Sequence, residues 1–261
     1  MVDGAVTARR TDKTADRIVF LGHATVLIEL DGVRLLTDPL LRDRVAHLRR
    51  QLPPVQRDLF ADPDVVLISH LHHDHLDLAS LRLLGGEVPL IVPAGAGEWL
   101  RRRGFAMVTE LGVGDVAKVG TLTVTAVPAH HDGRRLAGPH AAPLGYLASG
   151  GHAVYFAGDT ELFAEMTNLS RAPLDVALLP VAGWGPTLGP GHMDSLDAAR
   201  AVQLIQPRIA IPVHWGTLLP VGLGRHRARL ADPPRLFAEH VASLVPSVEV
   251  RILSPGQGME F

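Results

Sequence analysis

Residues 69–77 hold the densest group of potential metal ligands in the chain, reading Ser-His-Leu-His-His-Asp-His-Leu-Asp. Four of the 14 histidines fall within six residues here, which ordinary packing would not require. Neutral imidazole and carboxylate are suitable ligands for zinc, manganese and iron(II). In an extended backbone His70 and His72 would lie on the same side. A tight turn can then aim these two at one metal ion and Asp74 and His75 at a second, so the pattern predicts a metal site.

Each ion needs further ligands from elsewhere in the chain, and three segments can supply them. In each, an expected strand is followed by His or Asp with a glycine close by, and in α/β architectures ligands gather at strand ends. The segments are Pro128-Ala129-His130-His131-Asp132-Gly133, Ala157-Gly158-Asp159-Thr160 and Val213-His214-Trp215-Gly216-Thr217. A carboxylate such as that of Asp159 can bridge two ions. Together with residues 69–77, these segments would complete two coordination shells.

The composition indicates one large domain and excludes several classes of function. The chain has 261 residues, 47% of them apolar, which is enough for a substantial core. A formal net charge of −2 gives no reason to expect nucleic acid or an anionic membrane as a partner. Without cysteine, disulfides, thiolate nucleophiles and Cys-ligated zinc are excluded. No apolar run reaches the ~18 residues of a membrane-spanning helix, and the polar start lacks the apolar segment of a signal peptide. We therefore expect a cytoplasmic protein that acts on a small-molecule substrate, and the oligomeric state is left open.

The elements that must position these side chains are short strands mixed with a few helices. Strands are expected over residues 17–21, 25–30, 33–37, 65–69, 90–92, 121–127, 144–148, 153–156, 176–179, 208–212 and 248–252. Helices are expected over residues 76–84, 96–103, 195–205 and 233–244. Asp194 or Ser195 would be the N-cap of the third helix. Asp31-Gly32 indicates a hairpin, and the Arg-rich segment 42–58 is expected to be a loop.

This order of elements predicts an α/β fold in which two sheets pack face to face with helices outside. Residues 1–16 are expected to form a mobile tail. Residues 17–261 would then form a single domain.

The chain resembles the metallo-β-lactamase fold superfamily, whose signature His70, His72, Asp74 and His75 match. It is similar in particular to the branch that contains N-acylethanolamine-phospholipase-D-like phosphodiesterases and UlaG-like lactonases. The similarity runs from about Val19 to Thr217. Four further segments carry it: Gly22-His23-Ala24-Thr25-Val26-Leu27-Ile28-Glu29, Leu36-Thr37-Asp38-Pro39, Phe156-Ala157-Gly158-Asp159-Thr160 and His214-Trp215-Gly216-Thr217.

This resemblance implies an αββα sandwich of two mixed sheets with the metals at one edge. It implies two sets of three ligands bridged by Asp159, and these sets are His70, His72 and His131 at one ion and Asp74, His75 and His214 at the other. His131 holds the fourth place of a Pro-Ala-x-His stretch similar to that of the family. His130 is the alternative ligand.

Three more side chains are candidates for supporting roles. Thr37-Asp38-Pro39 resembles a segment that ends a strand near the metals in the related proteins, so Asp38 is the first candidate to orient a metal-bound imidazole. The alternative for Asp38 is a turn residue before a proline. His23 could hydrogen-bond near the site or serve the fold. His192 could contact the substrate or simply lead into the helix that follows it.

The chain also departs from the patterns it resembles. The phospholipase-like proteins usually carry an aromatic residue where this chain has His73, and another where it has Asp132. These departures argue against a lipid substrate. The thiol ligand of the best known zinc β-lactamases is absent, so hydrolysis of antibiotics is not favoured.

The predicted function is a hydrolase that uses two divalent ions to activate water, with zinc expected first and manganese or iron(II) as alternatives. Two ions, two carboxylates and a bridging hydroxide leave about one formal positive charge, which suits an anionic phosphodiester or a developing oxyanion. Asp74 would be the catalytic side chain that orients the hydroxide and carries the leaving-group proton. The substrate could be a phosphodiester or a lactone or other ester. The alternatives are a nuclease of the same fold, against which the charge balance argues, and a metal-binding protein without catalysis.

Overall fold

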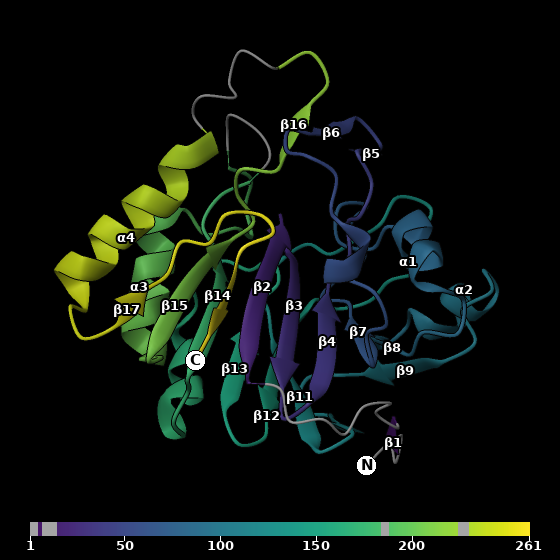
Figure 1. The fold of residues 1–261 in the computed structure, drawn as a ribbon, viewed down its shortest axis with the longest axis horizontal. Coiled ribbons are helices and arrows are strands. Elements are labelled where there is room, and N and C mark those ends of the chain that lie inside the picture. The colour runs from purple at the N-terminus through teal and green to yellow at the C-terminus, as the bar shows by residue number, and fades with distance from the viewer. Residues whose placement is uncertain (1–4, 7–14, 184–187, 224–229) are drawn as a thin grey trace.

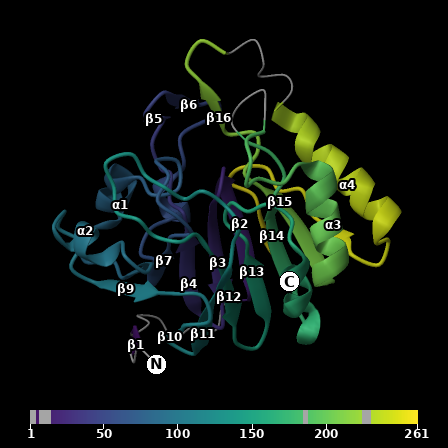
Figure 2. The ribbon, with the colours of Figure 1, turned by 180° about the vertical axis from the view of Figure 1, so that it is seen from behind.

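Two large sheets packed face to face form the centre of the computed structural model, and helices cover both outer faces (Figures 1 and 2). The structure describes residues 5–6, 15–183, 188–223 and 230–261. The arrangement is the αββα sandwich that the resemblance implies. Within these described residues, no helix combines the length and the apolar character needed to cross a membrane.

The first sheet has seven strands and is mixed. It is antiparallel from β18 to β4 and parallel from β4 to β9. In spatial order its strands are β18 (Gly258–Glu260), β2 (Arg17–Gly22), β3 (Thr25–Leu30), β4 (Val33–Thr37), β7 (Val65–Leu67), β8 (Leu90–Pro93) and β9 (Val108–Leu111).

The second sheet has eight strands, and three of its central strands, β13, β14 and β15, run parallel to one another. Their carboxyl ends therefore lie at one edge of the sandwich. In spatial order the strands are β1 (Ala5–Val6), β10 (Val116–Val119), β11 (Leu122–Pro128), β12 (Leu144–Ser149), β13 (Ala153–Phe156), β14 (Val176–Pro180), β15 (Ile209–Val213) and β17 (Glu249–Val250).

The central strands are apolar on both faces because each sheet is covered by the other sheet on one face and by helices on the other. In β14, Val176 and Leu178 pack into the layer between the sheets, whereas Ala177 and Leu179 pack toward the outer helices. Successive side chains of a strand point to opposite faces, so burial on both faces produces a continuous apolar run instead of an alternating one. Strands β9, β10 and β18 add to the set expected from the sequence.

Two pairs of helices cover the outer faces. α3 (Ser195–Ile205) and α4 (Asp232–Leu244) pack on the eight-stranded sheet, and α1 (Leu78–Leu84) and α2 (Gly97–Arg101) pack on the seven-stranded sheet. Short 3-10 segments are η1 (Arg57–Leu59) and η2 (Ala164–Arg171). Asp194 is the N-cap of α3, accepting from two backbone N–H groups.

Two predicted helix boundaries were wrong. α1 begins at Leu78 instead of residue 76 because the Asp77 carboxylate accepts a hydrogen bond from the Ser80 backbone N–H and so caps the helix. α2 spans Gly97–Arg101 and is shorter than the predicted 96–103.

The prediction of a loop over residues 42–58 was wrong in part. The segment contains β5 (Arg44–Val45) and β6 (Leu48–Arg50), which form a three-stranded sheet with β16 (Leu218–Pro220) above the main sandwich (Figure 1). Val45, Leu48 and Leu218 share a small apolar cluster with Leu40. Strands of two and three residues are too short to show an alternation of apolar and polar side chains. In addition, β16 lies far from β5 and β6 in the sequence.

In the described part of the chain, the N-terminal segment contacts the domain through residues 5–6 and through Asp16. The backbone of residues 5–6 pairs in parallel with β10. The Asp16 carboxylate accepts hydrogen bonds from the Asp31 backbone N–H and from His152 Nδ1. Residues 1–4 and 7–14 lie outside the described part of the chain, so a mobile tail and a domain boundary at residue 16 stay predictions.

Candidate metal centre

Four strand ends bring the predicted ligands to one edge of the sandwich. β7 leads into the turn that carries residues 70–75, β11 leads to His131, β13 to Asp159 and β15 to His214. All seven predicted ligand side chains meet at this edge, and we call them the His/Asp cluster: His70, His72, Asp74, His75, His131, Asp159 and His214.

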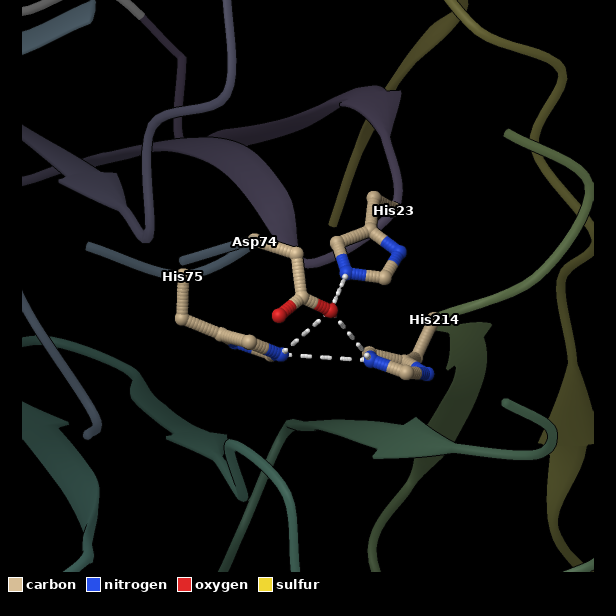
Figure 3. Close-up of side chains that lie close together, drawn as sticks. All are labelled: His23, Asp74, His75 and His214. Carbon is tan, nitrogen blue, oxygen red and sulfur yellow. Dashed lines mark hydrogen bonds and ion pairs between the residues drawn. The ribbon is translucent and has the colours of Figure 1, made fainter. Parts of the chain in front are cut away.

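One part of the cluster, which we call the buried half, consists of Asp74, His75 and His214 (Figure 3). Nε2 of His75 lies 3.2 Å from Nε2 of His214. Asp74 Oδ2 lies 3.6 Å from the first of these nitrogens and 3.9 Å from the second. Asp159 Oδ2 lies 3.2 Å and 3.3 Å from the same two nitrogens. Both carboxylate oxygens therefore lie close to the same pair of imidazole nitrogens.

The other part, which we call the open half, consists of His70, His72 and His131. His72 Nδ1 lies 3.0 Å from His70 Nε2 and 3.1 Å from His131 Nε2. His70 is fully buried, whereas His72 and His131 are partly exposed. Three nitrogens thus converge on a second point that is accessible from solvent.

The residues fit a pair of divalent ions on two independent grounds. In a tetrahedral zinc site with bonds of about 2.0–2.2 Å, ligand atoms lie about 3.3–3.6 Å apart, close to the separations in the buried half. In addition, Oδ1 of Asp159 is buried and has no hydrogen-bond partner among the described residues. A buried carboxylate oxygen without a partner is costly. A cation on each side of Asp159 would satisfy both of its oxygens.

The charges around Asp159 are also those of a cation site. Burial alone would lower the pKa of His75, but Asp159 and Asp74 outweigh it and hold that pKa well above the usual value. Burial alone would raise the pKa of Asp159, but His214 and His75 hold it well below. Positive charge next to the two buried carboxylates therefore stabilises their ionised state, and a divalent ion would supply such charge.

The open half offers neutral imidazoles. Burial lowers the pKa of His131 to about 4 and lowers the pKa of His70 well below its usual value. Burial also lowers the pKa of His72. A histidine must be unprotonated at its binding nitrogen to ligate a metal, so these side chains are in the right state at neutral pH.

Asp38 orients imidazoles of both halves. Its buried carboxylate accepts from His75 Nδ1 at 2.7 Å and from the Ser69 hydroxyl at 2.5 Å. Ser69 Oγ in turn lies 2.9 Å from His70 Nδ1, which can donate to it. Both imidazoles then present Nε2 to the centre, as metal-binding histidines do when a carboxylate or carbonyl holds the other nitrogen. Asp38 thus contacts His75 directly and His70 through Ser69, and its role in orienting metal-bound imidazoles stays a prediction.

Backbone carbonyls hold two more of the imidazoles. His214 Nδ1 donates to the Ala182 carbonyl at 2.7 Å, and His131 Nδ1 donates to the Gly191 carbonyl at 2.8 Å. His214 has a φ of +61° and Asp38 a φ of +34°. Such left-handed backbone costs about 1–3 kcal/mol per non-glycine residue and tends to occur at functional sites.

The structure separates the two adjacent candidates His130 and His131. The His131 ring lies 4.7 Å from that of His70, inside the cluster. The His130 ring is exposed and stacks on Phe163 at 4.1 Å, on the other side of the backbone. Consecutive residues of an extended segment point in opposite directions, so only His131 reaches the other ligands.

His23 and His192 also reach the cluster. His23 Nε2 lies 3.0 Å from Asp74 Oδ2. His192 Nε2 lies 3.4 Å from Asp159 Oδ2, and its ring contacts that of His131 edge-on at 4.7 Å. His192 also precedes the capping residue of α3, so the two roles considered for it are compatible.

Sequence reasoning missed the side chain that spans the turn of residues 70–75. Arg135 Nη1 donates to the carbonyls of Leu71 and Leu76, at 3.0 Å and 2.8 Å. These carbonyls flank the turn that carries His72, Asp74 and His75. No local signal in the sequence relates an arginine after β11 to this turn, because the contact forms only when the two sheets pack.

Comparison with known proteins places the chain among metal-dependent hydrolases. A family model, the Beta-lactamase superfamily domain, matches residues 33–215. A UPF0173 metal-dependent hydrolase of Methanopyrus kandleri is 36% identical over 252 residues, covering 94% of this chain and 99% of that protein.

Two further relatives extend the comparison. An N-acyl-phosphatidylethanolamine-hydrolyzing phospholipase D of Caenorhabditis elegans is 31% identical over 229 residues, 78% of this chain and 64% of that protein. Among solved structures, a metallo hydrolase of the archaeon Ignicoccus hospitalis is similar with a TM-score of 0.74 and 26% identity, over 95% of this chain and 99% of that one.

Proposed function

This chain is a metal-dependent hydrolase that belongs to the metallo-β-lactamase fold superfamily. From that premise we propose that it holds two divalent metal ions in the His/Asp cluster and hydrolyses a phosphodiester or a lactone or other ester. Zinc is the first candidate metal, because imidazole and carboxylate ligands in tetrahedral spacing suit it, and manganese or iron(II) are alternatives. When bound, the two ions would lower the pKa of water toward ~7 and polarise the substrate oxygen.

The observation that carries this proposal is the position of Asp159. One of its oxygens lies within 3.2–3.4 Å of three imidazoles from separate parts of the chain, and the other is buried without a partner among the residues that the structure describes. A buried carboxylate with these contacts is suited to bind two cations at once. The arrangement favours two ions over one, because the imidazoles of the buried and open halves converge on different points.

Asp74 is the side chain we propose for proton handling. Burial alone would raise its pKa, but His75, His23 and His214 hold that pKa well below the usual value. An ionised Asp74 can accept a hydrogen bond from the attacking water and so orient it, and can take the proton that this water loses and deliver it to the leaving group. His192, partly exposed beside Asp159, is placed to contact the substrate at the open half.

The rim of the site supports a polar substrate. His73 and Asp132 are both exposed, and Asp132 pairs with Arg134. The phospholipase D of C. elegans acts on a lipid, but the exposed polar side chains here favour a substrate without a long acyl chain. About one formal positive charge at the loaded centre would favour an anionic phosphodiester. The net charge of −2 gives nucleic acid no general attraction to this chain.

The test combines metal analysis with a substrate screen. We expect two equivalents of metal per chain, and turnover of bis-p-nitrophenyl phosphate or of a member of a lactone panel that Asp74→Ala abolishes. His130→Gln is the matched control, because His130 is next to a ligand but points at Phe163, and it should keep both metal content and turnover. Two bound metals without turnover on any substrate would contradict catalysis, and a single equivalent would contradict the bridged pair.

A further inference from the structure

His23 occupies a strained turn that faces the buried half. It follows Gly22 in the connection between β2 and β3, and its φ is +56°. The side chain is only 2% exposed. Non-glycine residues adopt this backbone rarely, and when they do the surrounding structure has to enforce it. A strained, buried histidine next to candidate metal ligands therefore needs an explanation.

The surrounding structure fixes this turn from both sides. The His23 backbone N–H donates to Thr217 Oγ1 at 2.6 Å, and its carbonyl accepts from the His214 N–H at 2.8 Å. Arg50 Nη2 donates to the Leu21 carbonyl at 2.6 Å. Gly22 has a φ of +111°, which L side chains rarely adopt, and a Cβ there would also crowd Arg50 Nη2 and Thr217 Oγ1 at 3.0 Å, so this position favours glycine. The backbone of His23 is thus tied to the strand end that carries His214.

The His23 imidazole points toward one carboxylate oxygen of Asp74. Nε2 of His23 lies 3.0 Å from Oδ2 of Asp74, the oxygen that also faces His75 and His214 (Figure 3). The His23 ring packs 4.0 Å from the His214 ring. An ionised carboxylate can only accept a hydrogen bond. The contact of 3.0 Å is therefore a hydrogen bond when Nε2 of His23 carries the proton, whereas an unprotonated Nε2 could ligate a metal ion together with Asp74, His75 and His214. A protonated Nε2 cannot also ligate a metal, and the two roles exclude each other.

The geometry of the buried half decides between these roles. The Oδ2 atoms of Asp74 and Asp159 each lie 3.2–3.9 Å from the Nε2 atoms of His75 and His214, so four candidate ligand atoms are available without His23. A fifth protein ligand is not needed there. Hydrogen-bonding partners that hold metal ligands in place are, in contrast, a regular part of such sites.

We propose that His23 is a positioning residue whose Nε2–H donates to Asp74 Oδ2 and holds this carboxylate in the orientation that serves the buried half. This inference rests on the two-metal hydrolase proposed above. The His23 carbonyl also accepts a hydrogen bond from the backbone N–H of His214. His23 therefore contacts two candidate ligands, Asp74 and His214, that lie far apart in the sequence. It aligns the side chain of one with the backbone of the other.

A pair of variants at the same strained position isolates the hydrogen bond. His23→Leu removes the donor, and His23→Gln keeps a side-chain N–H, while both place an ordinary residue at positive φ. We expect His23→Leu to weaken binding of one of two zinc ions by about 10–100-fold and to lower kcat with little change in KM. His23→Gln should restore most of both. His152→Gln, which contacts Asp16 at a distant site, is the histidine control and should change neither.

Two measurements separate positioning from ligation and from a purely structural role. X-ray absorption of zinc-loaded protein should count the same number of imidazoles in the original chain and in both variants, and a lower count in both would make His23 a ligand. Zinc affinity of His23→Leu equal to that of the original chain would leave His23 a structural residue only. Either result overturns the proposal.

A third measurement uses the unaltered chain, in case the variants do not fold. Nitrogen-15 NMR of the zinc-loaded protein should show a slowly exchanging proton on Nε2 of His23, and an Nε2 without a proton contradicts the inference. Zinc affinity and NMR do not depend on turnover. A zinc-loaded protein that hydrolyses nothing would therefore refute the proposed function while the role of His23 is still decided.

Discussion

The buried and open halves of the His/Asp cluster differ in their side chains and in their surroundings, because the buried half includes the carboxylate of Asp74 whereas the open half has imidazoles alone. Asp74, His75 and His214 are buried, and each is tied to the fold by a further contact, to His23, Asp38 and the Ala182 carbonyl respectively. His72 and His131, in the open half, are partly exposed.

From this difference we expect the buried half to retain its metal ion and the open half to admit the substrate. Ligands whose positions are set before binding lose little freedom when an ion arrives, so the buried half should retain its metal tightly. The partly exposed imidazoles of His72 and His131 in the open half leave room for a substrate. Asp159 lies between the halves, next to His75 and His214 of the buried half and within 4.8 Å of His131 of the open half. Asp38 links the halves through Ser69.

The largest expected difference between the halves is in the stability of the metal-free protein. His75→Ala removes the only imidazole that pairs directly with buried Asp38, among the described residues. Breaking a buried pair by removing one partner costs about 3–5 kcal/mol. His72→Ala, at a partly exposed position, should cost about 1 kcal/mol or less. Urea denaturation of both metal-free variants measures this contrast, and equal losses would show that the halves are equally integrated into the fold.

A smaller effect should test the link between the halves. Asp38→Asn keeps the shape of the side chain but removes its charge, so it weakens the orientation of His75 directly and that of His70 through Ser69. We expect the affinity for both metal ions to fall by about 10–100-fold. Stepwise competition with a chromophoric chelator measures the two affinities. A loss confined to one ion would mean that Ser69 does not transmit the effect of Asp38.

The smallest effect is expected at the solvent side of the open half. His192→Gln removes an imidazole that contacts Asp159 Oδ2 at 3.4 Å but lies outside the two proposed ligand sets. Losing one hydrogen bond to the substrate should lower kcat/KM by about tenfold, with two metal ions retained. Metal content and steady-state kinetics on the best substrate of the screen test this. Loss of a metal ion in this variant would instead make His192 a ligand of the open half.

Some of the site was predictable because its signal is local. Residues 70–75 carry four potential ligands within one turn, and the motifs around Asp159 and His214 each follow a short apolar strand. Strands of this kind are recognisable because both of their faces are buried. The hairpin at Asp31 and Gly32 was also predictable and is confirmed, since φ values of +49° and +77° are what Asp-Gly supplies at such a turn.

Other features could not be read from the sequence because they depend on packing between distant segments. The small sheet of β5, β6 and β16 joins residues near 45 to residues near 219, and neither segment has a period of its own. Two further contacts form only in the folded chain. Arg135 donates to the carbonyls that flank the turn of residues 70–75, and Ser69 links Asp38 to His70.

The sequence by itself determined which side chains are available for metal chemistry and that they follow strand ends, because residue type and strand period are local properties. Only the tertiary structure decided that His131 and not His130 faces the other ligands, that Asp38 serves both halves, and that His23 meets Asp74. Those outcomes depend on the twist and register that bring separate strand ends together, and a change of one residue in register would turn each side chain to the opposite face.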